Sequence, residues 1–279
     1  MYDGASPPHT AFVLGGGGLR GAAEIGMLAA LIERGIRPDL VVGTSVGAVN
    51  GAAVASNPTP ATLDRLIEAW TSPEAARIYG DGVLHQARRA FQSHTHINSP
   101  EPLRGLLEQF IGPDTRFEEL DVPFAAVSAC IERAAEHVFT TGPVIPAVIA
   151  STAVPGLFPA AEIGGEHFVD GGVVNSIPIS PAVDAGAREI YVLQVGVVEQ
   201  PLTAPHTPIE TARVAFEISR RHRFARDLET CPDGVRIHVL PSGGPLVEDG
   251  KLSTNWDISK TLPRIEHTKR AAAEHLDTL

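Results

Sequence analysis

The stretch LVVGTSVG, residues 40–47, decides the fold class, because an apolar run leads directly into a serine that has a glycine two residues away on each side. The residues after Ser45, VGAVNGAAVAS, are small enough to form a closely packed helix. A sharp turn between a strand and a helix exposes the serine side chain, and the helix N-terminus adds partial positive charge. The G-x-S-x-G pattern therefore predicts a nucleophilic serine, and a passive serine in a glycine-rich turn is the alternative.

A second unit of the same kind precedes this stretch. The apolar run TAFVL, residues 10–14, is halted by four glycines. The segment GAAEIGMLAALIERG follows with helical apolar spacing, and Gly35 is placed as its C-cap. Two successive units of strand and helix predict a parallel sheet that is covered by helices on both faces.

The rest of the chain continues this alternation. An N-cap residue before a proline predicts helices through Trp70 and through Ile111. Further strands are expected at 123–131, 189–196 and 235–241, a hairpin at 161–169 with its turn at Gly164 and Gly165, and helices at 180–186, 208–228 and after 262. We therefore expect an α/β fold, a three-layer sandwich with a mainly parallel central sheet, in which residues 1–279 form one domain.

Composition and charge exclude several classes of protein. Hydrophobic residues make up 43% of the 279 residues, which suits a sizeable core, and the net charge of −11 argues against a nucleic-acid partner. No apolar run approaches the roughly 18 residues of a membrane span, and the first nine residues do not resemble a signal peptide. Cys130 and Cys231 lie far apart without metal-binding spacing. We therefore expect a cytoplasmic protein without a metal, and leave peripheral membrane contact open.

The glycine segment 15–21 has two sharp interpretations. Gly16, Gly18 and Gly21 match the dinucleotide-binding pattern G-x-G-x-x-G, while the same exposed amides could instead stabilise a tetrahedral acyl intermediate. A nucleotide site requires an acidic residue at the end of the second strand, and that strand ends at Gly43. The sequence therefore favours an oxyanion loop over a nucleotide site.

A nucleophilic serine also needs a base. Among the eleven histidines, His167 and His238 lie in expected strands, and strand alternation turns His167 away from the face that carries Asp170. Asp170 follows an apolar strand and precedes Gly171 and Gly172, so it is delivered at a strand end where a substrate or another chain segment can approach. A carboxylate acts as the base only if it lies beside the serine, and Asp170 is the better candidate.

Four segments, in this order, resemble the motif blocks of the patatin-like phospholipase family in its bacterial form: GGGGLRGAAEIGML, DLVVGTSVGAVNGA, IASTAVPGLFP and FVDGGVVNSIP. The resemblance implies a patatin-like fold over residues 10–180 and no metal or other cofactor. It implies a catalytic dyad of Ser45 and Asp170, with an oxyanion hole formed by the backbone amides of Gly16, Gly17 and Gly18. The supporting motif residues are Arg20, Gly21, Gly43, Gly47, Gly171 and Gly172. Beyond about Pro201 no motif is found, so the C-terminal third is unassigned.

What the resemblance implies is a serine acyl-ester hydrolase that acts on lipids through an acyl-enzyme, of the phospholipase A or lysophospholipase type. Two rivals remain. The same acyl-enzyme could pass its acyl group to an acceptor other than water, which would make the protein an acyltransferase. Alternatively, the chain could be a lipid-binding regulatory protein whose site is catalytically idle.

Two further segments have a lipid-related interpretation and an ordinary one. Residues 72–98 mix apolar and basic residues, which suits either a cap over an acyl pocket or a surface helix and loop. The stretch RRHRFAR, residues 220–226, could meet anionic head groups, although a solvated basic face is the favoured interpretation given the net charge of −11.

Overall fold

The computed structural model describes residues 8–72, 78, 95–195, 201–242 and 258–279. Eight strands in these residues form one sheet, in which hydrogen-bonded pairs follow the series β5-β6-β3-β2-β1-β7-β8, and β4 also pairs with β3. The strands are β1 (Thr10–Leu14), β2 (Leu40–Thr44), β3 (Phe124–Cys130), β4 (Ala135–Phe139), β5 (Ala161–Ile163), β6 (Glu166–Asp170), β7 (Glu189–Leu193) and β8 (Arg236–Leu240).

The sheet is mixed. β3, β2, β1, β7 and β8 run parallel to one another, while β4 and β6 run antiparallel to β3, and β5 runs antiparallel to β6. The parallel part carries the two units expected from the sequence, with β1 followed by α1 and β2 followed by α2. The expected α/β fold is confirmed, and the antiparallel strands occupy one end of the sheet.

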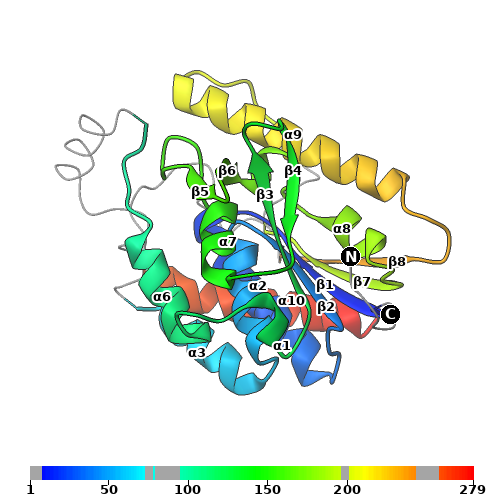
Figure 1. Cartoon of the computed structure of the whole chain (residues 1–279). Coiled ribbons are helices and arrows are strands. Elements are labelled where there is room, and N and C mark those ends of the chain that lie inside the picture. Colours follow the sequence, from blue (N-terminus) through cyan, green and yellow to red (C-terminus); the bar gives the residue numbers. More distant parts are fainter. Residues whose placement is uncertain (1–7, 73–77, 79–94, 196–200, 243–257) are drawn as a thin grey trace.

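Helices cover both faces of this sheet. They are α1 (Ala22–Glu33), α2 (Val46–Ser56), α3 (Pro60–Trp70), α6 (Glu101–Ile111), α7 (Val144–Ser151), α8 (Ile179–Asp184), α9 (Pro208–Glu229) and α10 (Thr261–Leu276). Figure 1 shows α9 on one side of the sheet and α1, α3 and α10 on the other. Short 3-10 turns include η1 (Gly18–Gly21) and η3 (Gly171–Val173).

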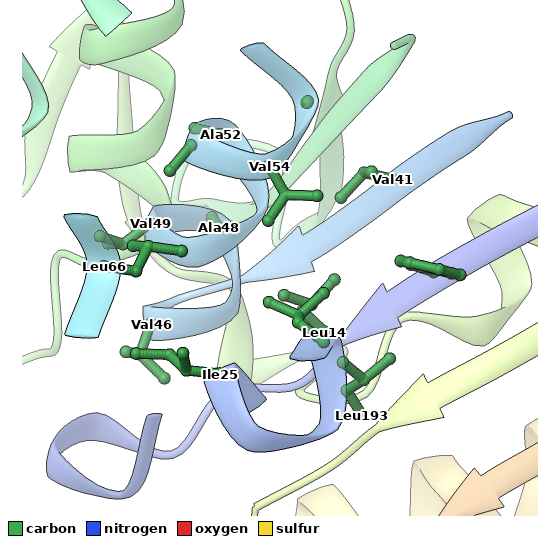
Figure 2. Packing of buried hydrophobic residues seen from close by; sticks show 14 of the residues in the cluster. Leu14, Ile25, Val41, Val46, Ala48, Val49, Ala52, Val54, Leu66 and Leu193 are labelled. Atoms are coloured by element: carbon green, nitrogen blue, oxygen red, sulfur yellow. The ribbon is translucent and has the colours of Figure 1, made fainter. Parts of the chain in front are cut away.

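Two hydrophobic cores establish the three layers. Phe12 and Leu14 of β1 pack into the larger core with α1, α2, α3, α6, α7 and α10, part of which is shown in Figure 2. Ala11 and Val13 point to the opposite face, where they pack with α8 and with Phe224 of α9. Successive side chains of a strand alternate between faces, so one strand contributes to both cores. The expected three-layer arrangement is confirmed.

Two elements were not expected from the sequence, β4 and α7. The interpretation of residues 72–98 as a cap over an acyl pocket falls largely on 73–77 and 79–94, which lie outside the described residues. Ile78 is described, and it is buried in the larger core. Across the part of the chain that the structure describes, no helix combines the length and apolar character needed to span a membrane.

Candidate active site

Ser45 occupies a sharp turn between β2 and α2. Its backbone has φ 57° and ψ −125°, a conformation that non-glycine residues adopt at a cost of order 1–3 kcal/mol. Its amide donates a hydrogen bond to Ser151 Oγ at 2.9 Å, and Ser151 Oγ in turn donates to the carbonyl of Val127 in β3 at 2.6 Å. The strained turn is therefore tied to the sheet. Ser45 is only 7% exposed, so the expectation that this turn exposes the serine side chain is wrong.

The two glycines of the motif allow the turn to close. A Cβ at Gly43 would overlap the carbonyl oxygen of Gly47, and a Cβ at Gly47 would overlap the carbonyl oxygen of Leu14 in β1. Both obstacles are backbone atoms, which cannot swing aside as a flexible side chain can. The G-x-S-x-G spacing is thus explained by close approach of α2 to the ends of β1 and β2.

The close approach of Gly47 to β1 leads to a prediction about the stability of the Gly47→Ala variant. We expect the substitution to lower the free energy of unfolding by about 1–3 kcal/mol, because the added methyl group must push α2 away from β1. Gly105→Ala in α6 is the matched control, since a Cβ there meets no atom within 4 Å. Urea unfolding should show the control unchanged or stabilised by up to about 1 kcal/mol through helix propensity. Equal stability of the two variants would contradict the steric explanation.

β3 brings the ends of β2 and β6 together. β2 runs parallel to β3 with Thr44 opposite Val127, and β6 runs antiparallel to β3 with Asp170 opposite Ser128. β4 pairs with the same two residues of β3 and so occupies its other edge. β2 and β6 therefore share one edge of β3 and meet end to end, which places Ser45 beside Asp170.

The two side chains form a direct hydrogen bond. Ser45 Oγ donates to Asp170 Oδ2 at 2.6 Å, and the amide of Gly172 donates to Asp170 Oδ1 at 2.7 Å. Asp170 is 1% exposed, and burial raises its pKa from 3.8 to about 6 against the opposing effect of these two hydrogen bonds. A Cβ at Gly171 would overlap the carbonyl oxygen of Val127, which explains the first glycine of the D-G-G block. The site thus holds a serine hydroxyl on a carboxylate that can gain or lose a proton near neutral pH.

The two histidines weighed in the sequence lie elsewhere. His167 is exposed, whereas Asp170 is buried, as the strand alternation predicts. The His167 ring bonds to Glu132 Oε1 at 2.7 Å. His238 bonds to Glu189 in β7 and stacks on Tyr191, with ring centroids 5.0 Å apart. The hydrogen bonds that Ser45 and Asp170 make with described residues involve no histidine. In the same residues, no group of three or more His, Cys, Asp or Glu is arranged to hold a metal ion.

The glycine loop lies directly against the serine. The amide of Gly15 donates to the carbonyl of Leu193 at 3.0 Å, and the amide of Gly16 donates to the carbonyl of Ser176 at 2.7 Å. A Cβ at Gly16 would stand 3.4 Å from the Cβ of Ser45. The loop is therefore fastened at its start to β7 and to the segment that follows Asp170.

Of the three glycines expected to form the oxyanion hole, Gly16 already uses its amide. The amides of Gly17 and Gly18 donate to no acceptor among the described residues. Gly18 has φ 56°, which suits glycine, and a Cβ at Gly17 would overlap the side chain of Val195. The amides that can meet a developing oxyanion are thus those of Gly17 and Gly18.

A buried polar cluster fastens the far end of the loop. Asn50 of α2 donates from Nδ2 to the carbonyl of Gly21 at 3.0 Å and to Glu24 Oε2 at 2.8 Å, and Trp70 Nε1 donates to Asn50 Oδ1 at 3.0 Å. Burial raises the pKa of Glu24 well above its usual value. Arg20 sits half-buried within η1, with its amide donating to the carbonyl of Gly17 at 3.2 Å.

The basic stretch 220–226 differs from its interpretation as a solvated face. The side chain of Arg220 is 2% exposed, and that of Arg223 is 32% exposed and bonded to Asp227 at 2.8 Å. Arg226 is exposed. Arg220 is therefore buried and Arg223 half-buried, so the expectation of a solvated face is wrong for Arg220.

Several residues that support the site were not expected from the sequence. Ser151 holds the amide of Ser45, the carbonyl of Ala153 accepts from the amide of Asp170 at 2.9 Å, and the carbonyl of Asn175 accepts from Thr44 Oγ1 at 2.9 Å. Ser151 and Ala153 lie in the third motif block and Asn175 in the fourth. The blocks mark these segments, but only the fold assigns a hydrogen bond to each residue.

Comparison with known proteins places this site in a family. The family model described as patatin-like phospholipase matches residues 12–183, more than half of the chain. The lysophospholipase NTE1 of Cryptococcus neoformans is 35% identical over 189 residues, which cover 67% of this chain and 11% of that protein. Patatin-like phospholipase domain-containing protein 7 of Rattus norvegicus is 31% identical over 188 residues, 67% of this chain and 13% of that protein. An uncharacterised NTE family protein of Mycobacterium bovis is 31% identical over 184 residues, which cover 66% of this chain and 48% of that protein.

The chain thus spans from about a tenth to about half of the length of these relatives. Two solved structures share the fold. VipD from Legionella pneumophila has a TM-score of 0.51 at 14% identity, covering 98% of this chain and 67% of that one. ExoU of Pseudomonas aeruginosa, in complex with SpcU, has a TM-score of 0.50 at 17% identity, and the match covers 98% of this chain and 53% of that one. With the family match over the residues that build the serine and aspartate turns, this chain belongs to the patatin-like phospholipase family.

Proposed function

We propose that this chain hydrolyses the acyl esters of lipids, as a phospholipase A or lysophospholipase, with Ser45 as nucleophile and Asp170 as general base. The observation that carries the proposal is the 2.6 Å hydrogen bond from Ser45 Oγ to a carboxylate that is 1% exposed. A base within hydrogen-bond reach of a nucleophile is the geometry that acyl transfer requires.

The proposed reaction uses these groups in the following steps. Ser45 Oγ attacks the ester carbonyl carbon while its proton passes to Asp170 Oδ2, and the amides of Gly17 and Gly18 stabilise the resulting oxyanion. Collapse of the tetrahedral intermediate breaks the ester bond, and Asp170 returns the proton to the departing alcohol. Water then attacks the acyl-enzyme while its proton passes to Asp170. Asp170 returns this proton to Ser45 Oγ as the fatty acid leaves, which restores Ser45.

The relatives support lipid as the substrate class. One is named a lysophospholipase and another a patatin-like phospholipase domain-containing protein. The matched part of this chain contains both proposed catalytic residues, since residues 12–183 include Ser45 and Asp170. The proposed substrate is therefore a lipid acyl ester.

The direct test measures fatty acid released from lysophosphatidylcholine, together with hydrolysis of p-nitrophenyl esters of increasing chain length. Labelling by a fluorophosphonate probe reports whether Ser45 is nucleophilic. The matched control is Ser56→Ala, at the opposite end of α2, where Ser56 Oγ donates to the carbonyl of Ala53 at 2.8 Å and to no other acceptor in the described residues. Absence of both hydrolysis and labelling would indicate an idle site, and acyl transfer to added glycerol in place of hydrolysis would indicate an acyltransferase.

The raised pKa of Asp170 predicts the pH dependence of the reaction. The carboxylate accepts a proton only when it is ionised, so activity should rise as pH increases through the Asp170 pKa of about 6 and level off above it. At pH 5 we expect kcat/KM to be about a tenth of its plateau, from the fraction ionised. Initial rates on one soluble ester between pH 4.5 and 8.5 check this. A profile that is flat or falls over this range would contradict Asp170 as base.

A further inference from the structure

Helix α9 lies beyond the residues that match the family model, yet it touches the active-site loops. The face of α9 that points inward carries Phe216, Arg220, Arg223, Phe224 and Asp227, which recur at helical spacing. Phe224 joins the core on its side of the sheet. The charged members of this face stand where a helix packed on a sheet ordinarily presents apolar side chains.

Arg220 holds the segment on which the glycine loop rests. Its Nη2 donates to Gln194 Oε1 at 2.9 Å and to the carbonyl of Val195 at 3.0 Å, and Nη1 faces Glu217 at 3.4 Å. The side chain of Val195 fills the space beside Gly17, where a Cβ would overlap it. Arg220 therefore fixes Val195, and Val195 packs beside Gly17, whose backbone amide is proposed to meet the oxyanion.

Stability alone does not explain a guanidinium at this place. Arg220 is 3% exposed, burial lowers its pKa, and its Nε makes no hydrogen bond with any described residue. A buried ion pair is often no more stabilising than well-packed apolar side chains of similar volume. The hydrogen bonds from Arg220 do, however, set the position of Gln194 and Val195, which an apolar side chain could not do.

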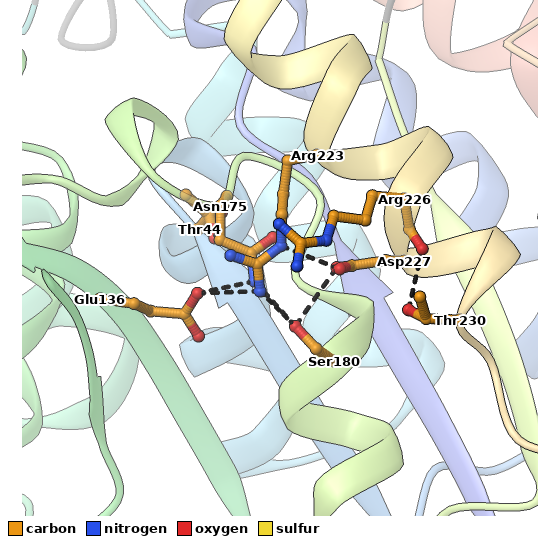
Figure 3. A network of polar contacts seen from close by, with 8 residues as sticks. All are labelled: Thr44, Glu136, Asn175, Ser180, Arg223, Arg226, Asp227 and Thr230. Atoms are coloured by element: carbon orange, nitrogen blue, oxygen red, sulfur yellow. Dashed lines mark hydrogen bonds and ion pairs between the residues drawn. The ribbon is translucent and has the colours of Figure 1, made fainter.

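One turn further along α9, Arg223 and Asp227 hold the segment after the catalytic aspartate (Figure 3). Arg223 donates to Asp227 Oδ1 at 2.8 Å and to Ser180 Oγ at 2.7 Å, and Ser180 Oγ lies 3.2 Å from Asp227 Oδ2. Asn175 Nδ2 donates to Ser180 Oγ at 3.2 Å. This network reaches the segment that follows Asp170 from the side of α9.

Asn175 connects that network to the nucleophile. Its carbonyl accepts from Thr44 Oγ1 at 2.9 Å, and Thr44 directly precedes Ser45. Its Nδ2 also donates to Glu136 of β4 at 3.0 Å, and Arg223 lies 3.3 Å from the same carboxylate oxygen. Hydrogen bonds therefore connect Arg223 through Ser180 to Asn175. Asn175 in turn accepts from the Thr44 hydroxyl beside Ser45, and its backbone amide donates to the carbonyl of Gly171 beside Asp170 at 2.8 Å.

The same helix also packs on η3 at the catalytic aspartate. A Cβ at Gly172 would overlap the ring of Phe216, and Ser219 Oγ donates to the carbonyl of Val173 at 3.2 Å. The amide of Gly172 is the one that binds Asp170, so Phe216 packs on the residue that supplies this hydrogen bond. α9 thus contacts the oxyanion side and the aspartate side of the site within three turns of helix.

We propose that α9 is the element that positions the two catalytic loops, with Arg220 a positioning residue for the glycine loop and Arg223 one for the turn that carries Asp170. The proposal rests on the proposed ester hydrolysis for its kinetic consequence. Its structural consequence, the order of the two loops, can be measured without any activity.

The experiment compares Arg220→Met and Arg223→Met with Arg226→Met, a control at an exposed position of the same helix. We expect kcat on a soluble p-nitrophenyl ester to fall at least tenfold in the first two variants, with KM within twofold, because the chemistry and not ester binding depends on the loops. Amide hydrogen exchange should accelerate in residues 15–21 for Arg220→Met and in residues 170–178 for Arg223→Met. The control should match wild type in both measurements.

Unchanged exchange in both segments, in folded variants, would overturn the proposal, as would a change in KM alone. If Arg220→Met does not fold, Arg220→Lys decides, since an ammonium on a different stem cannot keep the contacts to Glu217, Gln194 and Val195 together. Faster exchange at 15–21 in that variant supports the role, and exchange equal to Arg226→Met refutes it. A wild-type protein without esterase activity would refute the proposed function while the exchange results still test α9.

Discussion

Replacing Ser45 by alanine is expected to abolish ester hydrolysis, with kcat/KM falling by a factor on the order of 10³ or more. The hydroxyl that donates to Asp170 at 2.6 Å is the atom that would become acylated, and alanine has no equivalent. Alanine retains the Cβ, so the backbone at φ 57° experiences the same strain and the fold should persist. Hydrolysis of a soluble ester and circular dichroism spectra of both proteins are the measurements.

Ser56→Ala should keep wild-type activity in the same assay, because that hydroxyl donates to the carbonyl of Ala53 in its own helix. Labelling by a fluorophosphonate should disappear in Ser45→Ala and persist in the control. Activity within a few-fold of wild type after the loss of the Ser45 hydroxyl would remove this residue from the mechanism.

Asp170→Asn is expected to reduce turnover nearly as far, since an amide cannot accept the serine proton. Residues that act as one catalytic unit have effects that are not additive, so the double variant with Ser45→Ala should be scarcely worse than either single variant. His167→Gln and His238→Gln should retain activity, because both side chains bond to glutamates away from the site. A histidine variant that loses activity as fully as Ser45→Ala, while Asp170→Asn retains it, would restore a histidine base.

The same asparagine variant should be more stable than wild type at neutral pH. Burial raises the Asp170 pKa from 3.8 to about 6, so folding disfavours the charged carboxylate. The folded protein therefore carries no penalty below about pH 4, and the penalty develops as pH rises through 6, reaching about 3 kcal/mol from the difference of about two pKa units. The asparagine amide is uncharged at every pH and can still accept a hydrogen bond from the amide of Gly172.

Thermal unfolding at pH 4 and pH 8 tests whether Asp170→Asn is more stable than wild type and how this difference depends on pH. The gain of Asp170→Asn over wild type should be large at pH 8 and small at pH 4, whereas Asp121→Asn, at an exposed position, should change little at either pH. A variant that is less stable than wild type at pH 8 would show that the carboxylate is not held at an electrostatic cost.

Where a local signal exists, the sequence predicts the element. The proline after Thr59 begins α3, and Gly164 and Gly165 form the turn between β5 and β6. Gly35, at φ 74°, lies one residue beyond Arg34, which is the C-cap of α1. β4 was missed because its turn from β3 passes through Ala134 at φ 47°, without the glycine or asparagine that marks a hairpin. α7 was missed because VIPAVIAS is almost continuously apolar and buried, so it shows no helical period.

The two candidate catalytic residues can be identified from the sequence, whereas their contact cannot. Motifs identify Ser45 and Asp170, but nothing local states that β2 and β6 pair with one edge of β3 from opposite directions. The burial of Arg220 was missed because a cluster of arginines was interpreted by its charge. The spacing of Phe216, Arg220 and Phe224 on one helical face was a signal that these positions share a direction.

The shared edge of β3 has a consequence for how the chain becomes active. Ser45 and Asp170 are 125 positions apart, and they meet only after β3 has paired with both β2 and β6. Bringing such distant segments together carries a loop-closure cost that local helices do not have. If Ser45 is the nucleophile proposed above, its labelling by a fluorophosphonate should report the completed topology, whereas far-ultraviolet circular dichroism already registers α1 or α9 before these strands have paired.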